Sequence, residues 1–277
     1  MKNKGFDFSC ISEPHELILT GSTSVVIFED GEKMTFSDGS LKPHELNFVK
    51  KTRAEIIKNA TDRGYQEMRL WSDYKFFDIA APEYLKDGAT FNNSVVEIDI
   101  NNAYWNAAFN LSLICRDTYN KGLEMSKKVR LISVGSAASR KNHFYFNGED
   151  YEYLRTDENI AGISSFFRIS EYIGEIVSHL FNKHNLLMYW VDAIFVPKNQ
   201  VGAVCEYLEL AGMEYKVKPI DVLKYVFRAD RVEVITIREE NGEKKEKKYT
   251  KKTQKETEKT VFLRHIMEKA LNSAKNE

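Results

Sequence analysis

The sequence predicts an α+β fold in which strands and helices pack in layers. Strand-like and helix-like segments are mixed along the whole chain, and no segment repeats. Short alternating segments separated by glycine-containing turns predict antiparallel hairpins near both ends. Apolar residues recur at helical spacing in stretches between them. With 277 residues, of which 43% are apolar, the chain can bury the core of one large or two small domains.

The first sixty residues predict a hairpin followed by a helix. Residues 16–20 and 24–36 alternate in polarity, and Asp30-Gly31 supplies a second turn. From Pro43 to about Arg63 apolar residues recur at helical spacing, and Gly64 is placed to end this helix. Those apolar residues are Leu46, Val49, Ile56 and Ile57.

The middle of the chain contains an irregular stretch, a strand and helical segments. Residues 66–94 are rich in aromatic side chains and lead into a strand at Val95–Ile100. The segment 105–122 is predicted to be helical. Residues 129–134 fit either a strand or the start of a helix, and the sequence leaves both open. The most helix-like stretch of the protein runs from about residue 163 to residue 184.

Beyond this long helix, strands and helices alternate again. The predicted elements are a strand at 186–196, a turn at 197–200, a helix through residue 210, a short strand near 214–218, a hairpin of 232–238 and 244–250 around Asn241-Gly242, and a terminal helix at about 257–274.

Composition argues against several classes of protein. No apolar run approaches the roughly 18 residues that would indicate a membrane-spanning helix, and the N-terminus does not read as a signal peptide. We therefore expect no membrane partner. The three cysteines are widely spaced and form no CxxC pair, which supports neither a disulfide framework nor a zinc knuckle. These features predict a cytoplasmic protein, in the host cytoplasm if the gene is viral or plasmid-borne.

Two hydrophobic strands each carry one aspartate that could hold a metal ion. Asp99 lies near the end of Val95–Ile100, and Asp192 lies within the predicted strand Leu186–Val196. Because side chains alternate along a strand, Glu97 shares a face with Asp99, and Trp190 and Ile194 are expected to share a face with Asp192. If the two strands are neighbours, Asp99 and Asp192 converge.

These two segments carry a resemblance to a known family. The run from Asp99 to Tyr104, DINNAY, resembles the first palm motif of family B DNA polymerases, DxxSLYP. The run YWVDAIFV at 189–196 resembles the third motif, YxDTDSIFV, whose second aspartate falls on Asp192. The motif order and the long helix before the second strand match as well. The resemblance implies a polymerase-like palm, an antiparallel sheet packed on helices, with short fingers and thumb-like additions.

The resemblance also implies a two-metal site. Asp99 and Asp192 stand where the family holds its catalytic ions, Mg²⁺ or Mn²⁺, and two such ions ~3.5–4 Å apart can stabilise phosphoryl transfer. The sequence departs from the family at Trp190, which replaces the first aspartate of the third motif, and at Trp105, which replaces a proline. Glu97 could supply the missing charge as a further metal ligand, or it is simply exposed. Trp190 is expected in the core, with base stacking as the alternative.

Candidate nucleotide-binding residues follow the first motif. In the family, the position of Tyr104 lies beneath the sugar of the incoming nucleotide and favours deoxynucleotides. The middle motif, KxxxNSxYG, is not clearly present, but residues 127–141 combine small residues, hydroxyls and cations suited to phosphate. The cationic candidates in this stretch are Lys128, Arg130, Arg140 and Lys141.

Candidate nucleic-acid-binding residues lie nearer the C-terminus. Lys224-Tyr225 faintly resembles the family's lysine-tyrosine element that contacts the primer. Residues 238–255 contain eight basic side chains against four acidic ones, which favours contact with a nucleic-acid backbone. A solvated hairpin is the alternative explanation of this charge. The lysines proposed for this contact are Lys244, Lys245, Lys247 and Lys248.

The length of the chain limits the kind of polymerase that it could be. The predicted regions are an N-terminal hairpin and helix at 1–94, a palm-like core with a short fingers-like insertion at 95–227, and a thumb-like basic hairpin and helix at 228–277. The first region is too short for the proofreading exonuclease that the family usually carries. We therefore expect a small, poorly processive DNA polymerase or primase-like enzyme of a virus or mobile element. Its expected partners are template and primer DNA, deoxynucleotide triphosphates and replication proteins.

Two other functions fit the same residues. A catalytically inactive palm would bind nucleic acid or a replication partner, with Trp190 marking the loss of chemistry. A metal-dependent nuclease on an unrelated α+β fold would use the same carboxylates. Substitution of Asp99 or Asp192 by asparagine distinguishes catalysis from the inactive palm, and degradation without added nucleotides would indicate the nuclease.

Overall fold

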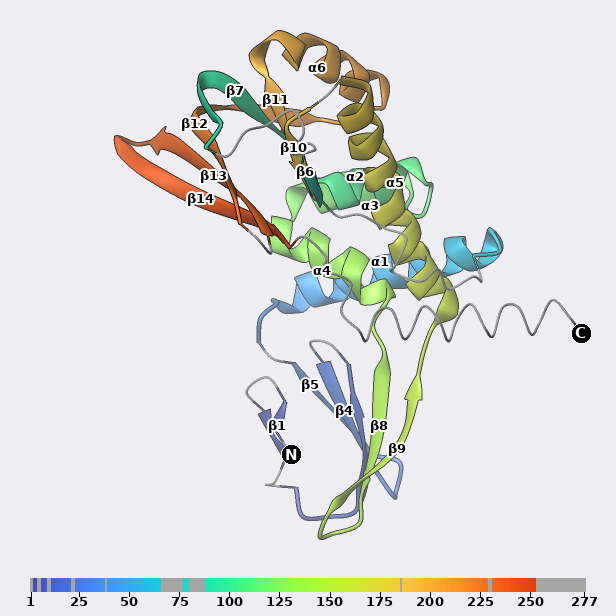
Figure 1. The fold of residues 1–277 in the computed structure, drawn as a ribbon. Coiled ribbons are helices and arrows are strands. Elements are labelled where there is room, and N and C mark those ends of the chain that lie inside the picture. Colours follow the sequence, from blue (N-terminus) through green and yellow to red (C-terminus); the bar gives the residue numbers. More distant parts are fainter. Residues whose placement is uncertain are drawn as a thin grey trace, which may run out of the picture. The chain divides into compact units, whose positions relative to one another are not determined.

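The computed structural model confirms a mixed α+β fold. Among the residues that it describes, the chain forms two large sheets, one two-stranded ladder and six α-helices (Figure 1). The described residues are 2–3, 6–8, 11–20, 23–37, 39–65, 77–79, 88–184, 186–228 and 231–252.

The chain divides into two compact units, and each is built from separate stretches of sequence. Unit 1 comprises Met1–Lys75 and Ile100–Val177, and unit 2 comprises Phe76–Asp99 and Ser178–Glu277. The three consecutive regions drawn from the sequence have different bounds, because the chain passes between the units three times. The first of these regions, 1–94, contributes strands to the sheets of both units.

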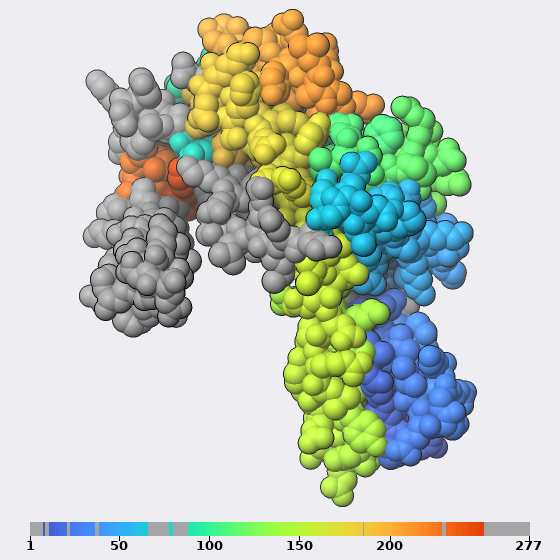
Figure 2. Space-filling model, turned by 90° about the vertical axis from the view of Figure 1, so that its right-hand side faces the viewer, coloured from blue at the N-terminus to red at the C-terminus, as the bar shows by residue number. Residues whose placement is uncertain are grey.

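Unit 1 contains a five-stranded antiparallel sheet in the order β5-β4-β3-β8-β9. The strands are β3 (His15–Leu19), β4 (Thr23–Phe28), β5 (Lys33–Ser37), β8 (Lys141–Phe146) and β9 (Tyr151–Asp157), beside the small ladder of β1 (Lys2–Asn3) and β2 (Phe6–Asp7). The predicted N-terminal hairpin and its second turn are confirmed. The hairpin of β8 and β9 adds to β3 and forms a yellow-green surface beside the blue N-terminal strands (Figure 2). Phe8, Leu17 and Val26 form the buried centre of one sheet face.

The helices of unit 1 start and end where local chemistry allows. They are α1 (Pro43–Asp62), α2 (Ala103–Asn110), α3 (Arg116–Glu124), α4 (Lys127–Ala137) and the first part of α5 (Ile160–His184). The helix predicted from Pro43 is confirmed, with proline in its first turn and Gly64 just beyond it at φ +71°. Residues 129–134, which the sequence left as either strand or helix, are helical. The Ser126 hydroxyl caps their helix by accepting a hydrogen bond from the Val129 amide.

The prediction of a single helix at 105–122 was wrong, because two helices occupy this segment. Ser112 follows α2 with φ +53°, a left-handed conformation that cannot continue a right-handed helix. The chain then restarts as α3 at Arg116.

Unit 2 is built on a seven-stranded sheet in the order β14-β13-β12-β7-β11-β10-β6. The strands are β6 (Phe77–Ile79), β7 (Thr90–Ile100), β10 (Met188–Trp190), β11 (Ala193–Pro197), β12 (Tyr215–Phe227), β13 (Arg231–Glu240) and β14 (Glu243–Lys252). The predicted hairpin around Asn241-Gly242 is confirmed, and both turn residues have positive φ, as a tight two-residue turn requires. The predicted terminal helix at 257–274 lies outside the described residues.

The sheet of unit 2 curls strongly around an apolar core. Phe195 on β11 lies against Tyr249 on β14, with ring centroids 5.3 Å apart, although three strands separate β11 and β14 in the sheet. Lys251 on β14 also forms an ion pair with Asp78 on β6, so the two edge strands meet. Near the end of α5, the Phe181 ring packs on the Tyr189 ring of β10, with ring centroids 5.4 Å apart. The predicted helix through residue 210 is confirmed as α6 (Val201–Leu210).

Candidate functional site

Asp192 lies in the turn of a hairpin. The segment 186–196 was expected to be one strand, but β10 and β11 pair through Trp190 and Ala193, and Val191-Asp192 forms the turn. Asp192 therefore does not share a strand face with Trp190 and Ile194, which corrects the prediction. Val191 adopts φ +58°, a strained conformation for a β-branched residue. Sequence reasoning missed this turn because valine ordinarily favours strands.

The strand that carries Asp99 is the direct neighbour of this hairpin. β7 and β11 are antiparallel, with Ala193 opposite Asp99 and Phe195 opposite Glu97. Asp192 is therefore the chain neighbour of the residue that pairs with Asp99. The condition on which the two-aspartate hypothesis depended, that the strands lie side by side, is met within unit 2. The Asp99 side chain is 29% exposed, so it is open to solvent.

Two cations from the other side of β7 reach its acidic residues. The ammonium of Lys218 on β12 lies 2.5 Å from Oδ2 of Asp99 and 3.4 Å from Oε1 of Glu97. Arg238 on β13 donates to the other carboxylate oxygen of Glu97. β12 and β7 run antiparallel. Lys218, early in β12, meets Asp99, late in β7, whereas the Tyr225 amide, late in β12, donates to the Ala89 carbonyl just before β7, 2.9 Å away.

Sequence analysis missed Lys218 and Arg238, and neither belongs to a motif that could have revealed it. They meet Glu97 through strand pairing between residues more than one hundred positions apart. Burial opposes charge on Lys218, but the hydrogen bond to Asp99, and the charges of Asp99 and Glu97, raise the pKa of Lys218 above its ordinary value. The ammonium therefore stays charged at neutral pH.

Asp99 and Asp192 are better suited than Glu97 to bind a metal ion. Glu97 is buried, and each of its oxygens already faces a cation, so it serves as the partner of Arg238 and Lys218. Within the described part of the chain, no three His, Cys, Asp or Glu side chains group as a metal cage. Magnesium prefers carboxylate, phosphate and water oxygens, and a two-carboxylate site is completed by a nucleotide. Asp99 and Asp192 are the residues suited to that role.

Trp190 is half-buried at the margin of the core of unit 2. It packs against the main apolar cluster, with its ring centroid 5.3 Å from that of Tyr249. The half-buried ring and its packing favour the core interpretation.

The predicted nucleotide-binding residues all lie in unit 1, whereas both aspartates lie in unit 2. Tyr104 on α2 stacks with Phe166, with ring centroids 6.4 Å apart. Arg130 donates to the Asn102 side chain at the start of α2 and to the carbonyls of Gly122 and Met125 near the end of α3. Its visible role is therefore to hold two helix ends in place.

The other three predicted cations of unit 1 lie on its surface. Lys128 donates to the Ser40 carbonyl at 2.8 Å, and Arg140 forms a 2.8 Å ion pair with Glu158. Lys141 is exposed at the start of β8. Such contacts are weak at the surface, so they leave these side chains able to bind phosphate.

Lys224 and Tyr225 differ in what they can contact. Lys224 is exposed on β12. Tyr225 is fully buried, and its hydroxyl donates to the Leu187 carbonyl at 2.8 Å. Burial also raises the pKa of Tyr225. Tyr225 is thus a core residue, which corrects its assignment to the nucleic-acid contact.

Acidic side chains pair with several lysines of the β13–β14 hairpin and partly neutralise their charge. Lys245 lies 2.7 Å from Glu240, and Lys248 lies 2.8 Å from Glu233. Lys247 lies over the Tyr249 ring, 4.8 Å from its centroid. The fourth predicted lysine, Lys244, is exposed and sits opposite a glutamate, at position 239, in the strand register.

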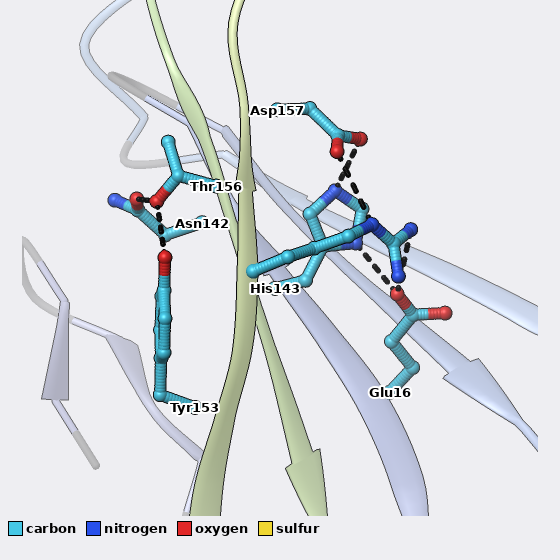
Figure 3. Close-up of polar contacts among 7 residues, drawn as sticks. Glu16, Asn142, His143, Tyr153, Thr156 and Asp157 are labelled. Carbon is cyan, nitrogen blue, oxygen red and sulfur yellow. Dashed lines mark hydrogen bonds and ion pairs between the residues drawn. The ribbon is translucent and has the colours of Figure 1, made fainter.

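A second polar cluster surrounds His143 on the sheet of unit 1. The buried His143 ring contacts Glu16 through Nδ1 at 2.6 Å and Asp157 through Nε2 at 2.8 Å (Figure 3). Arg155 forms ion pairs with the same two acids. Desolvation opposes the charge of Asp157, but the hydrogen bond from Arg155 and the charges of His143 and Arg155 lower its pKa. The two acids lie on opposite sides of the ring, so the cluster ties three strands together.

Comparison with known proteins adds no family to this geometry. No protein-family model matches the chain, and no curated protein matches it. Within the described part of the chain, no helix has the length and apolar character needed to cross a membrane.

Proposed function

We propose that the protein is a template-directed nucleotidyl transferase, a small DNA polymerase or primase-like polymerase, that uses Asp99 and Asp192. The observation that supports this most strongly is the strand register, in which Ala193, the neighbour of Asp192, pairs with Asp99. Two motifs separated by about ninety residues therefore meet at one sheet position. The palm architecture and the likeness to family B polymerases are part of the same proposal.

The chemistry assigned to this site is phosphoryl transfer. Bound Mg²⁺ or Mn²⁺ supplies positive charge that stabilises the attacking and leaving oxygens. Asp99, on a paired strand, and Asp192, in a tight turn, hold their carboxylates on rigid backbone, which favours a fixed reaction geometry. Arg238 pairs with Glu97, and Lys218 bonds to both Glu97 and Asp99, so a cationic group borders Asp99, where phosphate charge would develop.

The proposed partners are template and primer DNA, deoxynucleotide triphosphates and replication proteins. In this proposal the exposed side of the β13–β14 hairpin contacts the DNA backbone through Lys244 and its neighbouring lysines. Because acids partner Lys245 and Lys248, few cations of the hairpin are left to neutralise phosphates, so we expect weak DNA binding with a shallow dependence on salt.

One observation favours a second candidate function, that of an inactive palm that binds nucleic acid. Lys218 lies 2.5 Å from Asp99 and neutralises the carboxylate that a metal ion would use. Trp190 also stands in place of the first aspartate of the third motif, so the site resembles one in which the charge has been balanced internally. Such a protein would keep its binding function after both aspartates are replaced.

Primer extension on a short labelled template tests the proposal. Parent protein, Asp99→Asn and Asp192→Asn are compared with Mg²⁺ or Mn²⁺, with deoxy- or ribonucleotides, and with or without primer. The matched control is Asp150→Asn, an exposed aspartate at the tip of the β8–β9 hairpin in unit 1. We expect extension by the parent and the control and none by the two site variants. Binding without extension under every condition supports the inactive palm, and loss of labelled strand without nucleotides supports a nuclease.

A further inference from the structure

Lys218 occupies the position of a counter-ion between two acidic side chains. Its ammonium bonds to Asp99 and also faces Glu97, at 2.5 Å and 3.4 Å. The lysine comes from β12 and the acids from β7, and these two strands are neighbours in the sheet. Asp99 thus receives positive charge from the protein itself.

We propose that Lys218 is a tethered cation that competes with the divalent ion for Asp99 until a nucleotide binds. This inference rests on the proposed function, because it assumes that Asp99 is a metal ligand. A carboxylate oxygen that accepts a short bond from an ammonium is a poorer metal ligand, and two cations at the same oxygen repel each other. Metal binding therefore requires Lys218 to leave Asp99.

Exposure and side-chain flexibility make Lys218, and not Arg238, the group that moves. The Lys218 side chain is 36% exposed, whereas Arg238 is 15% exposed and bonds to the buried Glu97. A lysine carries its charge on a flexible four-carbon stem and binds phosphate as a point charge. Once released from Asp99, the ammonium is available to the phosphates of the nucleotide that brings the metal. Lys218 would then make metal binding conditional on nucleotide.

The expected consequence is a measurable change in metal affinity without any turnover. In the parent, Mn²⁺ alone should bind weakly, and a non-hydrolysable deoxynucleotide triphosphate should strengthen its binding. Lys218→Met removes the competing charge, so Mn²⁺ alone should bind at least about tenfold tighter, and the effect of nucleotide should shrink. Lys218→Arg keeps the charge and should retain the weak binding of the parent.

Electron paramagnetic resonance of free Mn²⁺ tests this inference on the full chain. Lys216→Met is the matched control, because Lys216 is exposed on the same strand, two residues away, and carries the same charge. Its effect should stay within about threefold, the size expected from long-range charge alone. Lys218→Gln is measured beside Lys218→Met, and a thermal melt of each variant confirms that it is folded.

Asp99→Asn separates failure of the inference from failure of the proposed function. If this change weakens Mn²⁺ binding while Lys218→Met and Lys218→Gln behave like Lys216→Met, Asp99 is a ligand and the tethered-cation inference is overturned. If Asp99→Asn has no effect in either the parent or the Lys218→Met background, Asp99 is not a metal ligand and both proposals fail. A tenfold gain in Lys218→Met that Asp99→Asn abolishes supports both.

Discussion

Replacing Arg238 tests whether Glu97 is a structural partner or a metal ligand. Glu97 and Arg238 are 7% and 15% exposed, so solvent screens their interaction little. Breaking a buried ion pair by removing one partner costs about 3–5 kcal/mol. Lys218 remains 3.4 Å from Glu97 and compensates in part. We therefore expect Arg238→Met to lower the free energy of unfolding by about 2–3 kcal/mol.

A double-mutant cycle isolates the pair. Glu97→Gln alone leaves Arg238 with a neutral acceptor and should cost about 1–2 kcal/mol. The double variant should then be less destabilised than the sum of the single variants by about 1–2 kcal/mol, because neither partner remains charged and alone. Urea unfolding followed by circular dichroism measures all four proteins. A coupling energy smaller than about 0.5 kcal/mol would refute the reasoning, since residues that act independently add within that margin.

Two further predictions concern stability. The hydrogen bonds from Lys248 and Arg231 lower the pKa of Glu233 to about 2, so its stabilising effect is present above the unfolded pKa and is lost as pH falls from about 4.5 toward 2. The urea midpoint should therefore fall less steeply with acid in Glu233→Gln than in the parent, and parallel slopes would contradict this. A Cβ on Gly162 would lie 2.1 Å from the carbonyl oxygen of the last residue of α4, so Gly162→Ala should destabilise by about 1–3 kcal/mol. Gly202→Ala, which meets open space on α6, should stabilise by about 0.5–1 kcal/mol in the same melts, and equal effects would exclude the steric explanation.

Elements specified by local chemistry could be predicted from the sequence. The helix that starts at Pro43 and the hairpin at Asn241-Gly242 depend on residues a few positions apart, and both are present. The long α5 helix was likewise visible in its apolar spacing. Positive φ at Ser112 and Val191 was not predictable, since neither residue type favours that conformation.

In the candidate site, too, residues in local motifs could be predicted, whereas residues brought in from distant strands could not. Asp99 and Asp192 were found because each follows a recognisable hydrophobic segment, and the register places those segments side by side. Lys218 and Arg238 escaped detection because the order of the strands, and not sequence spacing, brings them to Glu97. Tyr225 was misassigned because a tyrosine in a strand carries no mark of whether its ring points into the core. Strand order and side-chain burial thus decided what sequence spacing could not.

Single-turnover primer extension by parent, Asp99→Asn and Asp192→Asn proteins tests the central claim most directly. Each protein is first shown to be folded by its thermal melt, and primer-template is bound before Mg²⁺ and deoxynucleotides are added. The account predicts extension by the parent and a loss of at least about a thousandfold in rate for each variant, because each removes a carboxylate proposed to bind the ions. Extension at the parental rate by either variant would contradict the assignment of both aspartates to one catalytic site.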